Sequence, residues 1–165
     1  MTRNFVSADF VVPTSFKGEH FQLQVLGPDV NELDYEAVMS SKKNLRNIFA
    51  KNDPWPCDKM TAKENNSDLI THLREFNNRE AFAFTVLTPE KNKCIGCIYI
   101  EPCYRENFDA EVYFWIRDDN LYLESEFYRI VNKWIKDDWP FANTIWPGRE
   151  ISLKVWGKRS HSHNK

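Results

Sequence analysis

Three consecutive apolar segments, each the length of a β-strand, constrain the fold of this chain more than any other feature. They span residues 81–88, 93–101 and 109–117. Connections as short as those between them favour antiparallel neighbours in one sheet. The middle segment is apolar at nearly every position from Cys94 to Ile100, so we expect it to be covered by helices on both faces.

The flanking sequence predicts the remaining elements. Residues 20–26 alternate with period two, which predicts a first strand. Helices are predicted over 30–50 and, from a capping box at its start, over 61–79. Another amphipathic helix lies between Leu123 and Trp139, and residues 144–156 predict one or two last strands. The fold class is therefore α+β, with a mixed, mostly antiparallel central sheet of about five or six strands and helices on both faces.

Length and composition predict one domain. The chain has 165 residues, of which 42% are hydrophobic and 15% aromatic, enough to form a substantial core and to exclude collagen-like and disordered classes. Because no repeat or linker divides it, we expect a single domain over 1–156. Residues 1–19 are predicted to form an arm over the core, and 157–165 a disordered polar tail.

The charge balance argues against two classes of partner. Lys and Arg number 22 against 24 Asp and Glu, a net charge of −2, so neither nucleic acid nor an anionic membrane is an expected partner. No segment approaches the roughly 18 apolar residues of a membrane-spanning helix, and the first residues lack the apolar run of a signal peptide. A cytoplasmic location is therefore expected.

Four cysteines raise the question of metal or redox chemistry. Cys94 and Cys97 match the Cys-x-x-Cys pattern, but strand alternation predicts that they point to opposite faces. Cys57 and Cys103 add no recognised ligand spacing. Structural packing is favoured and no metal is expected, with a thiol or metal function as the lower-ranked alternative.

The order of elements and three local sequences resemble the GNAT acyltransferase superfamily. The segments are Asp34–Met39, Ile95–Ile100 and Ala110–Ile116, and they resemble the branch that acetylates ribosomal-protein N-termini and small amines. The resemblance covers residues 20 to about 146. It implies acetyl-CoA as co-substrate, without a metal, and a small-molecule or peptide amine as acceptor.

The resemblance also implies where the co-substrate binds. In that superfamily the fourth and fifth strands separate, and the pantetheine arm of acetyl-CoA pairs with the backbone of the fourth. The matching positions here are Phe114, Trp115 and Ile116, followed by Arg117 and Asn120. An ordinary structural role for these strand residues is the alternative.

The loop after the fourth strand departs from the family pattern. Family members have a glycine-rich loop whose backbone N–H groups hold the CoA pyrophosphate. Here residues 117–126 contain no glycine, and carboxylates crowd the same place at Asp118, Asp119, Glu124 and Glu126. The chain also has only a short segment after Thr144, where family members continue with another helix and two strands. These departures favour an altered or lost transferase site.

Glu111 and Tyr113 are the candidate catalytic residues. Glu111 stands where several GNAT enzymes carry a carboxylate base, and alternation places it on one face with Tyr113 and Trp115. Tyr113 or Tyr128 is a candidate acid for the leaving thiolate. The alternatives are an ion pair on a solvated face for Glu111 and a packing role for both tyrosines.

Two functions follow from these observations. The first is an N-acyltransferase that moves an acetyl group from acetyl-CoA to an amine, and the second is a catalytically inactive GNAT-fold module that binds a ligand or a protein. The tryptophan-rich region from Trp134 to Trp156 is a candidate surface for forming a homo-oligomer.

Overall fold

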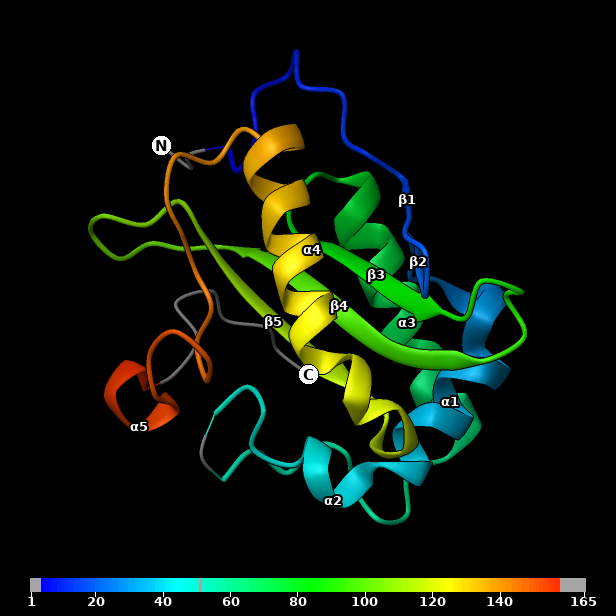
Figure 1. Ribbon diagram of the computed structural model, residues 1–165. Helices are drawn as coiled ribbons and strands as arrows, with labels where there is room; N and C mark the ends of the chain where they lie inside the picture. The colour runs from blue at the N-terminus through cyan, green and yellow to red at the C-terminus, as the bar shows by residue number, and fades with distance from the viewer. Residues whose placement is uncertain (1–3, 51, 158–165) are drawn as a thin grey trace.

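A six-stranded sheet forms the centre of the protein (Figure 1). The computed structural model describes residues 4–50 and 52–157. Neighbouring strands are antiparallel except for the last pair, β5 and β6, which is parallel. In spatial and chain order the strands are β1 Ser15–Lys17, β2 Gln22–Val25, β3 Phe82–Leu87, β4 Cys94–Pro102, β5 Ala110–Ile116 and β6 Thr144–Ile145. The predicted mixed, mostly antiparallel sheet is confirmed.

Helices lie on both faces of the sheet. Figure 1 shows α4 crossing one face, with α1 and α3 on the other. A single-turn 3-10 helix, η1 Pro28–Val30, leads into α1. A longer 3-10 helix, η2 Asp118–Leu123, leads into α4. The α-helices are α1 Asn31–Ser40, α2 Lys42–Leu45, α3 Ala62–Asn77, α4 Glu124–Asp138 and α5 Leu153–Trp156.

The start of α3 follows directly from its sequence. The Glu64 N–H donates to Thr61 Oγ1 at 3.1 Å, and the Thr61 N–H donates to Glu64 Oε2 at 2.9 Å. This reciprocal pair satisfies two backbone donors that would otherwise lack partners at a helix N-terminus. The capping box predicted from the sequence is confirmed.

The sheet separates two clusters of buried side chains. Every residue of β3, β4 and β5 is buried, which confirms that β4 is covered on both faces. The cluster on the side of α4, called here the α4-side cluster, includes Phe84, Ile98, Phe114, Phe127 and Trp134. The cluster on the other face, called the α1–α3-side cluster, includes Val38, Leu69, Cys97, Tyr99, Tyr113 and Trp115.

The prediction that Cys94 and Cys97 point to opposite faces is wrong. Both thiols lie in the α1–α3-side cluster. The pairing of β4 with β3 shifts between Val86 and Leu87, and β4 carries one extra residue, Ile95, at that point. Such a bulge inserts a residue without a partner and reverses the alternation beyond it, so two cysteines three positions apart share a face.

Other differences occur where side chains make contacts that no periodicity encodes. The helix predicted over 30–50 breaks at Ser41, whose hydroxyl accepts a hydrogen bond from the Asp118 N–H at 3.0 Å. Leu153–Trp156 form α5 instead of a strand, because the Ser152 hydroxyl accepts from the Val155 N–H at 3.2 Å and caps a helical turn, while Ile151 forms only an isolated bridge with Pro147.

The N-terminal arm contributes to both sheet and core. Its last part forms β1, a strand that the sequence analysis did not predict, and Val6 is buried. Phe5 stacks on Phe82 with ring centroids 5.6 Å apart. Of the predicted tail, only Gly157 falls within the described residues, and 158–165 lie outside them. None of the described helices combines the length and apolar character that crossing a membrane would need.

The C-terminal tryptophans pack inside the chain. Trp134, Trp139, Trp146 and Trp156 are all buried, and Trp134 and Trp139 contact each other at 5.6 Å between ring centroids. The homo-oligomer expected from this region therefore remains a prediction, and these four rings offer it no exposed surface.

Candidate active site

The outer edge of β5 has a strand partner over only its first two residues. Ala110 lies opposite Thr144 and Glu111 opposite Ile145. Beyond Glu111, no strand within the described residues runs along this edge. Figure 1 shows the chain leaving the neighbourhood of β5 after this pairing and turning toward α5. The sheet therefore has a free edge along the remainder of β5.

Hydrogen bonding to β4 determines which backbone groups of β5 face this edge. The Arg117 N–H donates to the Ile95 carbonyl of β4 at 2.8 Å. Because hydrogen-bonded positions alternate in an antiparallel ladder, the N–H and C=O groups of Val112, Phe114 and Ile116 point away from β4. Backbone groups of this kind need a hydrogen-bonding partner, which a strand, water or a ligand can supply.

The segment after β6 covers the side chain of Phe114. Trp146 is fully buried, and its ring centroid lies 5.8 Å from that of Phe114 and 5.0 Å from that of Tyr128. The Arg149 guanidinium lies 3.7 Å from the centroid of the Phe114 ring and forms an ion pair with Glu124 at 2.7 Å. The Trp146 indole N–H has no hydrogen-bond partner among the described residues. The α4-facing flank of β5 is thus closed, with one buried donor beside it.

Two carboxylates lie side by side on the opposite flank. Glu111 of β5 is directly opposite Glu101 of β4, and their exposed fractions are 0% and 2%. Side chains at directly opposed positions of an antiparallel pair have Cβ atoms about 4.5–5.5 Å apart. Burying two carboxyl groups this close carries a cost that hydrogen bonds, a counter-charge or protonation must offset.

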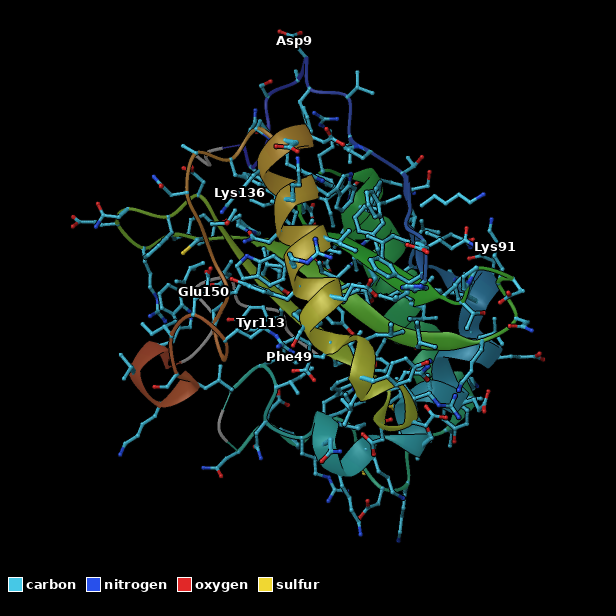
Figure 2. All side chains as sticks on the ribbon, viewed as in Figure 1. Asp9, Phe49, Lys91, Tyr113, Lys136 and Glu150 are labelled. Atoms are coloured by element: carbon cyan, nitrogen blue, oxygen red, sulfur yellow. The ribbon has the colours of Figure 1, made fainter. Side chains whose placement is uncertain are left out.

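Aromatic side chains surround this acidic pair. Phe49 lies with its ring centroid 5.1 Å from Tyr99, 5.4 Å from Tyr113 and 5.7 Å from Trp55. Figure 2 labels Phe49 and Tyr113 next to each other, to the left of the lower part of α4 in that view. The Trp115 indole donates to the Tyr99 hydroxyl at 3.1 Å, and burial raises the pKa of Tyr99 well above its usual value. The Tyr99 hydroxyl therefore remains protonated at neutral pH.

The loop after β5 uses its charges internally. Arg117 forms ion pairs with Glu36 and with Asp119, both at 3.1 Å, and Lys93 contacts Asp119 at 2.9 Å. The hydrogen bond from Lys93 is the largest cause that holds the pKa of Asp119 below its usual range. The Asn120 N–H donates to the Arg117 carbonyl. Two carboxylates thus neutralise the Arg117 guanidinium, while its buried Nη1 has no hydrogen-bond partner among the described residues.

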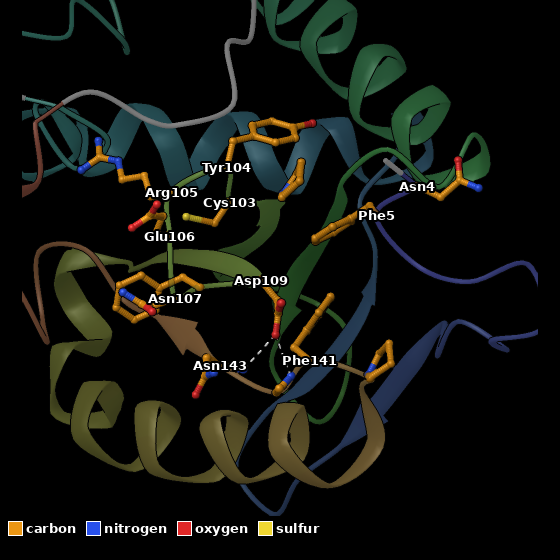
Figure 3. Close-up of a pocket in the computed structure, with 14 residues that line it drawn as sticks. Asn4, Phe5, Cys103, Tyr104, Arg105, Glu106, Asn107, Asp109, Phe141 and Asn143 are labelled. Carbon is orange, nitrogen blue, oxygen red and sulfur yellow. Dashed lines mark hydrogen bonds between the residues drawn. The ribbon is translucent and has the colours of Figure 1, made fainter. Parts of the chain in front are cut away.

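A cleft of about 640 Å³ lies at the N-terminal end of β5, away from the loop that follows the strand (Figure 3). Three segments line it: Asn4 and Phe5 of the N-terminal arm before β1, the connection between β4 and β5, and residues 140–143. Asp109 Oδ2 accepts hydrogen bonds from the Ala142 and Asn143 N–H groups at 2.9 and 3.0 Å, which fixes the wall of the cleft. Sequence reasoning missed this cleft because no single segment builds it.

Comparison with protein-family models and with curated proteins finds no match. Solved structures do match. The ribosomal-protein-S5-alanine acetyltransferase from Vibrio fischeri superposes with a TM-score of 0.57 at 16% identity, over 75% of this chain and 68% of that one. The microcin C7 self-immunity acetyltransferase MccE, in complex with acetyl-CoA and AMP, gives 0.61 at 18% identity, over 76% and 67%. RimL, a ribosomal L7/L12 acetyltransferase bound to coenzyme A, gives 0.55 at 12% identity, over 76% and 68%.

The chain has the GNAT fold. It spans about two thirds of the length of these GNAT structures. The fold prediction made from the order of elements and from the local sequences in α1, β4 and β5 is confirmed. The separation of β5 from β6 beyond Glu111 is the feature that the resemblance to GNAT proteins led us to expect.

The GNAT-fold sheet brings some predicted site residues together and separates others. Glu111, Tyr113 and Trp115 share the α1–α3 side of β5, and all three are buried, so Glu111 does not lie on a solvated face. Phe114 points to the other face and is covered by Trp146. Sequence reasoning missed Glu101, although its position opposite Glu111 follows once the two strands are paired in the correct register.

The predicted co-substrate residues differ in what they can offer. Phe114 and Ile116 present backbone groups at the free edge of β5, whereas Trp115 is hydrogen-bonded toward β4. Arg117 is engaged by two carboxylates, and the Asn120 amide nitrogen lies 3.4 Å from the Tyr122 hydroxyl. The backbone of β5 is therefore a more suitable binding element than the loop that follows it.

Proposed function

We propose that this protein is an N-acyltransferase that moves the acetyl group of acetyl-CoA to an amine of a small molecule or a peptide N-terminus. One observation carries the proposal: β5 loses its strand partner directly after Glu111, a carboxylate buried at that point. The GNAT-fold structures that match it are acetyltransferases by name, and MccE is in complex with acetyl-CoA.

The reaction needs two proton transfers. The acceptor nitrogen attacks the thioester carbonyl carbon, the carbon–sulfur bond breaks, and CoA leaves as a thiol. One proton must leave the amine and one must reach the sulfur. In this proposal Glu111 accepts the first, and Tyr113, two positions along the same face, donates the second.

The surroundings of Glu111 suit a cationic acceptor. An amine in water is mostly an ammonium ion, which must release one further proton to solvent before its nitrogen can attack, and the neighbouring carboxylate of Glu101 strengthens the attraction for the cation. The rings of Phe49, Tyr99 and Tyr113 cluster on this side of the sheet. Aromatic faces attract ammonium groups by about 0.5–2 kcal/mol, depending on desolvation.

The two ends of acetyl-CoA fit this site unequally. The amides of its pantetheine arm can pair with the outward backbone groups of Phe114 and Ile116. The Trp146 ring, whose buried indole N–H has no hydrogen-bond partner among the described residues, packs 5.8 Å from the Phe114 ring. The pyrophosphate lacks a cradle, because Arg117 is held by Glu36 and Asp119. We therefore expect acetyl-pantetheine to react nearly as well as acetyl-CoA.

The test measures amine-dependent formation of CoA by chromatography, with primary amines and short peptides bearing a free N-terminus as acceptors. Glu111→Gln is expected to lower the rate about 10²–10⁴-fold, the usual contribution of a general base. The matched control is Glu90→Gln, which alters an exposed carboxylate in the β3–β4 turn and leaves the rate unchanged. Equal rates in the two variants would remove Glu111 from the proposed chemistry.

A second function, a non-catalytic GNAT-fold binding module, is favoured by a specific observation. Trp146 and Arg149 cover Phe114, and the loop after β5 pairs its charges internally. A pantetheine arm would have to displace part of that cover. Calorimetry decides between the two: no heat with either acetyl-CoA or acetyl-pantetheine at millimolar concentration would leave the binding module as the function.

A further inference from the structure

Two thiols and one carboxylate meet between α1 and β4, on the same face of the sheet as the proposed transferase site. The bulge at Ile95 places Cys94 and Cys97 on the same face, and α1 brings Asp34 above them. One ligand atom from each of the three residues lies within 4.8 Å of the other two, and all three side chains are buried. Cys97 Sγ is 3.2 Å from Asp34 Oδ1.

Burying the carboxylate of Asp34 in this core costs free energy, because the charged group loses its contact with water. Its hydrogen-bond donors are the Asn65 amide at 2.8 Å and the Cys97 thiol, which is a weak donor. Within the described residues, no Lys, Arg or His forms an ion pair with it. A bound cation would supply the missing counter-charge and so offset the cost of burying this carboxylate.

We propose that Asp34, Cys94 and Cys97 form a binding site for one Zn²⁺ ion. Zinc–sulfur bonds of about 2.3 Å and zinc–oxygen bonds of about 2.0–2.2 Å in a tetrahedron place sulfur and oxygen about 3.5 Å apart. The observed separation of 3.2 Å between Cys97 and Asp34 is close to that value. Thr85 Oγ1, 3.4 Å from Cys94 Sγ, can supply a neutral oxygen for the fourth position.

The surrounding hydrogen bonds support this role. The Asn65 amide donates to the second carboxylate oxygen of Asp34 and fixes the orientation of the first toward Cys97. Such outer contacts orient ligands in metal sites. Zinc binds thiolates, so it must displace the proton of each thiol. Binding therefore releases protons to solvent and weakens as the pH falls.

The experiment uses the full chain, reduced and freed of metal with a chelator. Zn²⁺ is titrated in competition with a chromophoric chelator, and Co²⁺ is titrated as a spectroscopic substitute. We expect one equivalent of each metal to bind, and the Co²⁺ form to show thiolate-to-metal charge-transfer absorption. Cys97→Ser is expected to lower Zn²⁺ affinity at least about tenfold. Cys57→Ser, which alters an exposed cysteine outside the cluster, keeps the parent affinity.

Each other outcome overturns the proposal. Absence of stoichiometric binding, or equal affinities in Cys97→Ser and Cys57→Ser, excludes the site. Co²⁺ binding without charge-transfer absorption would assign the metal to imidazoles, such as His161 and His163 of the sequence, instead of thiolates. The spectrum of the parent protein keeps the test decisive if the cluster variants fail to fold, and it does not depend on whether acetyl transfer occurs.

Discussion

Replacing Gly96 by alanine tests the packing of β4 against β5 at its tightest point. Gly96 pairs with Ile116, and a Cβ built on its backbone would lie 2.2 Å from the carbonyl oxygen of Trp115 and 3.2 Å from Ile116 Cδ1. The nearest atom belongs to backbone, so no side-chain rotation can relieve the contact. Glycine is required here by the close approach of the neighbouring strand.

The expected cost follows from the displacement. The contact has to lengthen from 2.2 Å to beyond 3.0 Å, which moves β5 away from β4 where every residue is buried. Overpacking in a core costs about 1–3 kcal/mol. Loosening the ladder weakens hydrogen bonds with a net value of about 0.5–1.5 kcal/mol each. We therefore expect Gly96→Ala to lower the free energy of unfolding by about 2–4 kcal/mol.

Urea denaturation, followed by circular dichroism, measures this loss. In a chain of this size the melting temperature falls by about 2–4 °C per kcal/mol, so thermal unfolding gives a second measurement. The matched control is Gly27→Ala, because Gly27 has an extended φ of −156° and its added Cβ would meet only side-chain atoms of Asp29 and Leu73 at 3.3 Å or more. Equal stabilities of the two variants would refute the reasoning.

Three further predictions concern a helix cap and two titrating groups. Thr61→Ala removes one half of the α3 capping box, and we expect urea denaturation to show a loss of about 0.5–2 kcal/mol; no loss would contradict the cap. Burial and a hydrogen bond to Glu150 raise the pKa of Tyr128 to about 12. The folded state therefore favours the protonated hydroxyl, and the stability that this preference contributes is present below pH 10.0 and is lost as the pH rises toward 12. Ultraviolet titration of Glu150→Gln should show a lower pKa. The hydrogen bond that His20 Nδ1 donates to the Glu126 carboxylate raises the pKa of His20, and we expect Glu126→Gln to return this pKa toward 6.5 in an NMR titration.

The elements with strong local signals were predictable from the sequence. The three central strands, expected over 81–88, 93–101 and 109–117, were placed within a few residues because β-branched and aromatic residues fill them. The capping box placed α3 for a similar reason. Periodicity and capping are local properties, so one sequence is enough to read them.

The misplaced features depend on contacts between distant segments. The bulge at Ile95 arises from the pairing of β4 with β3, and no alternation within β4 reveals it. The break at Ser41 involves Asp118, which is far away in the chain. The candidate site was found only in part, because Glu111 has a local resemblance to guide it, whereas Glu101 becomes its neighbour only through strand register.

The division of the core by the central sheet affects how the protein tolerates change. The α4-side and α1–α3-side clusters share a backbone layer, while their side chains point in opposite directions. Energetic effects of truncations combine additively when the altered groups share no partners. A stabilising substitution in one cluster would thus raise the free energy of unfolding of the whole protein, but it would not restore the packing lost through a substitution in the other cluster. Directed evolution of the two faces can proceed as two largely independent searches.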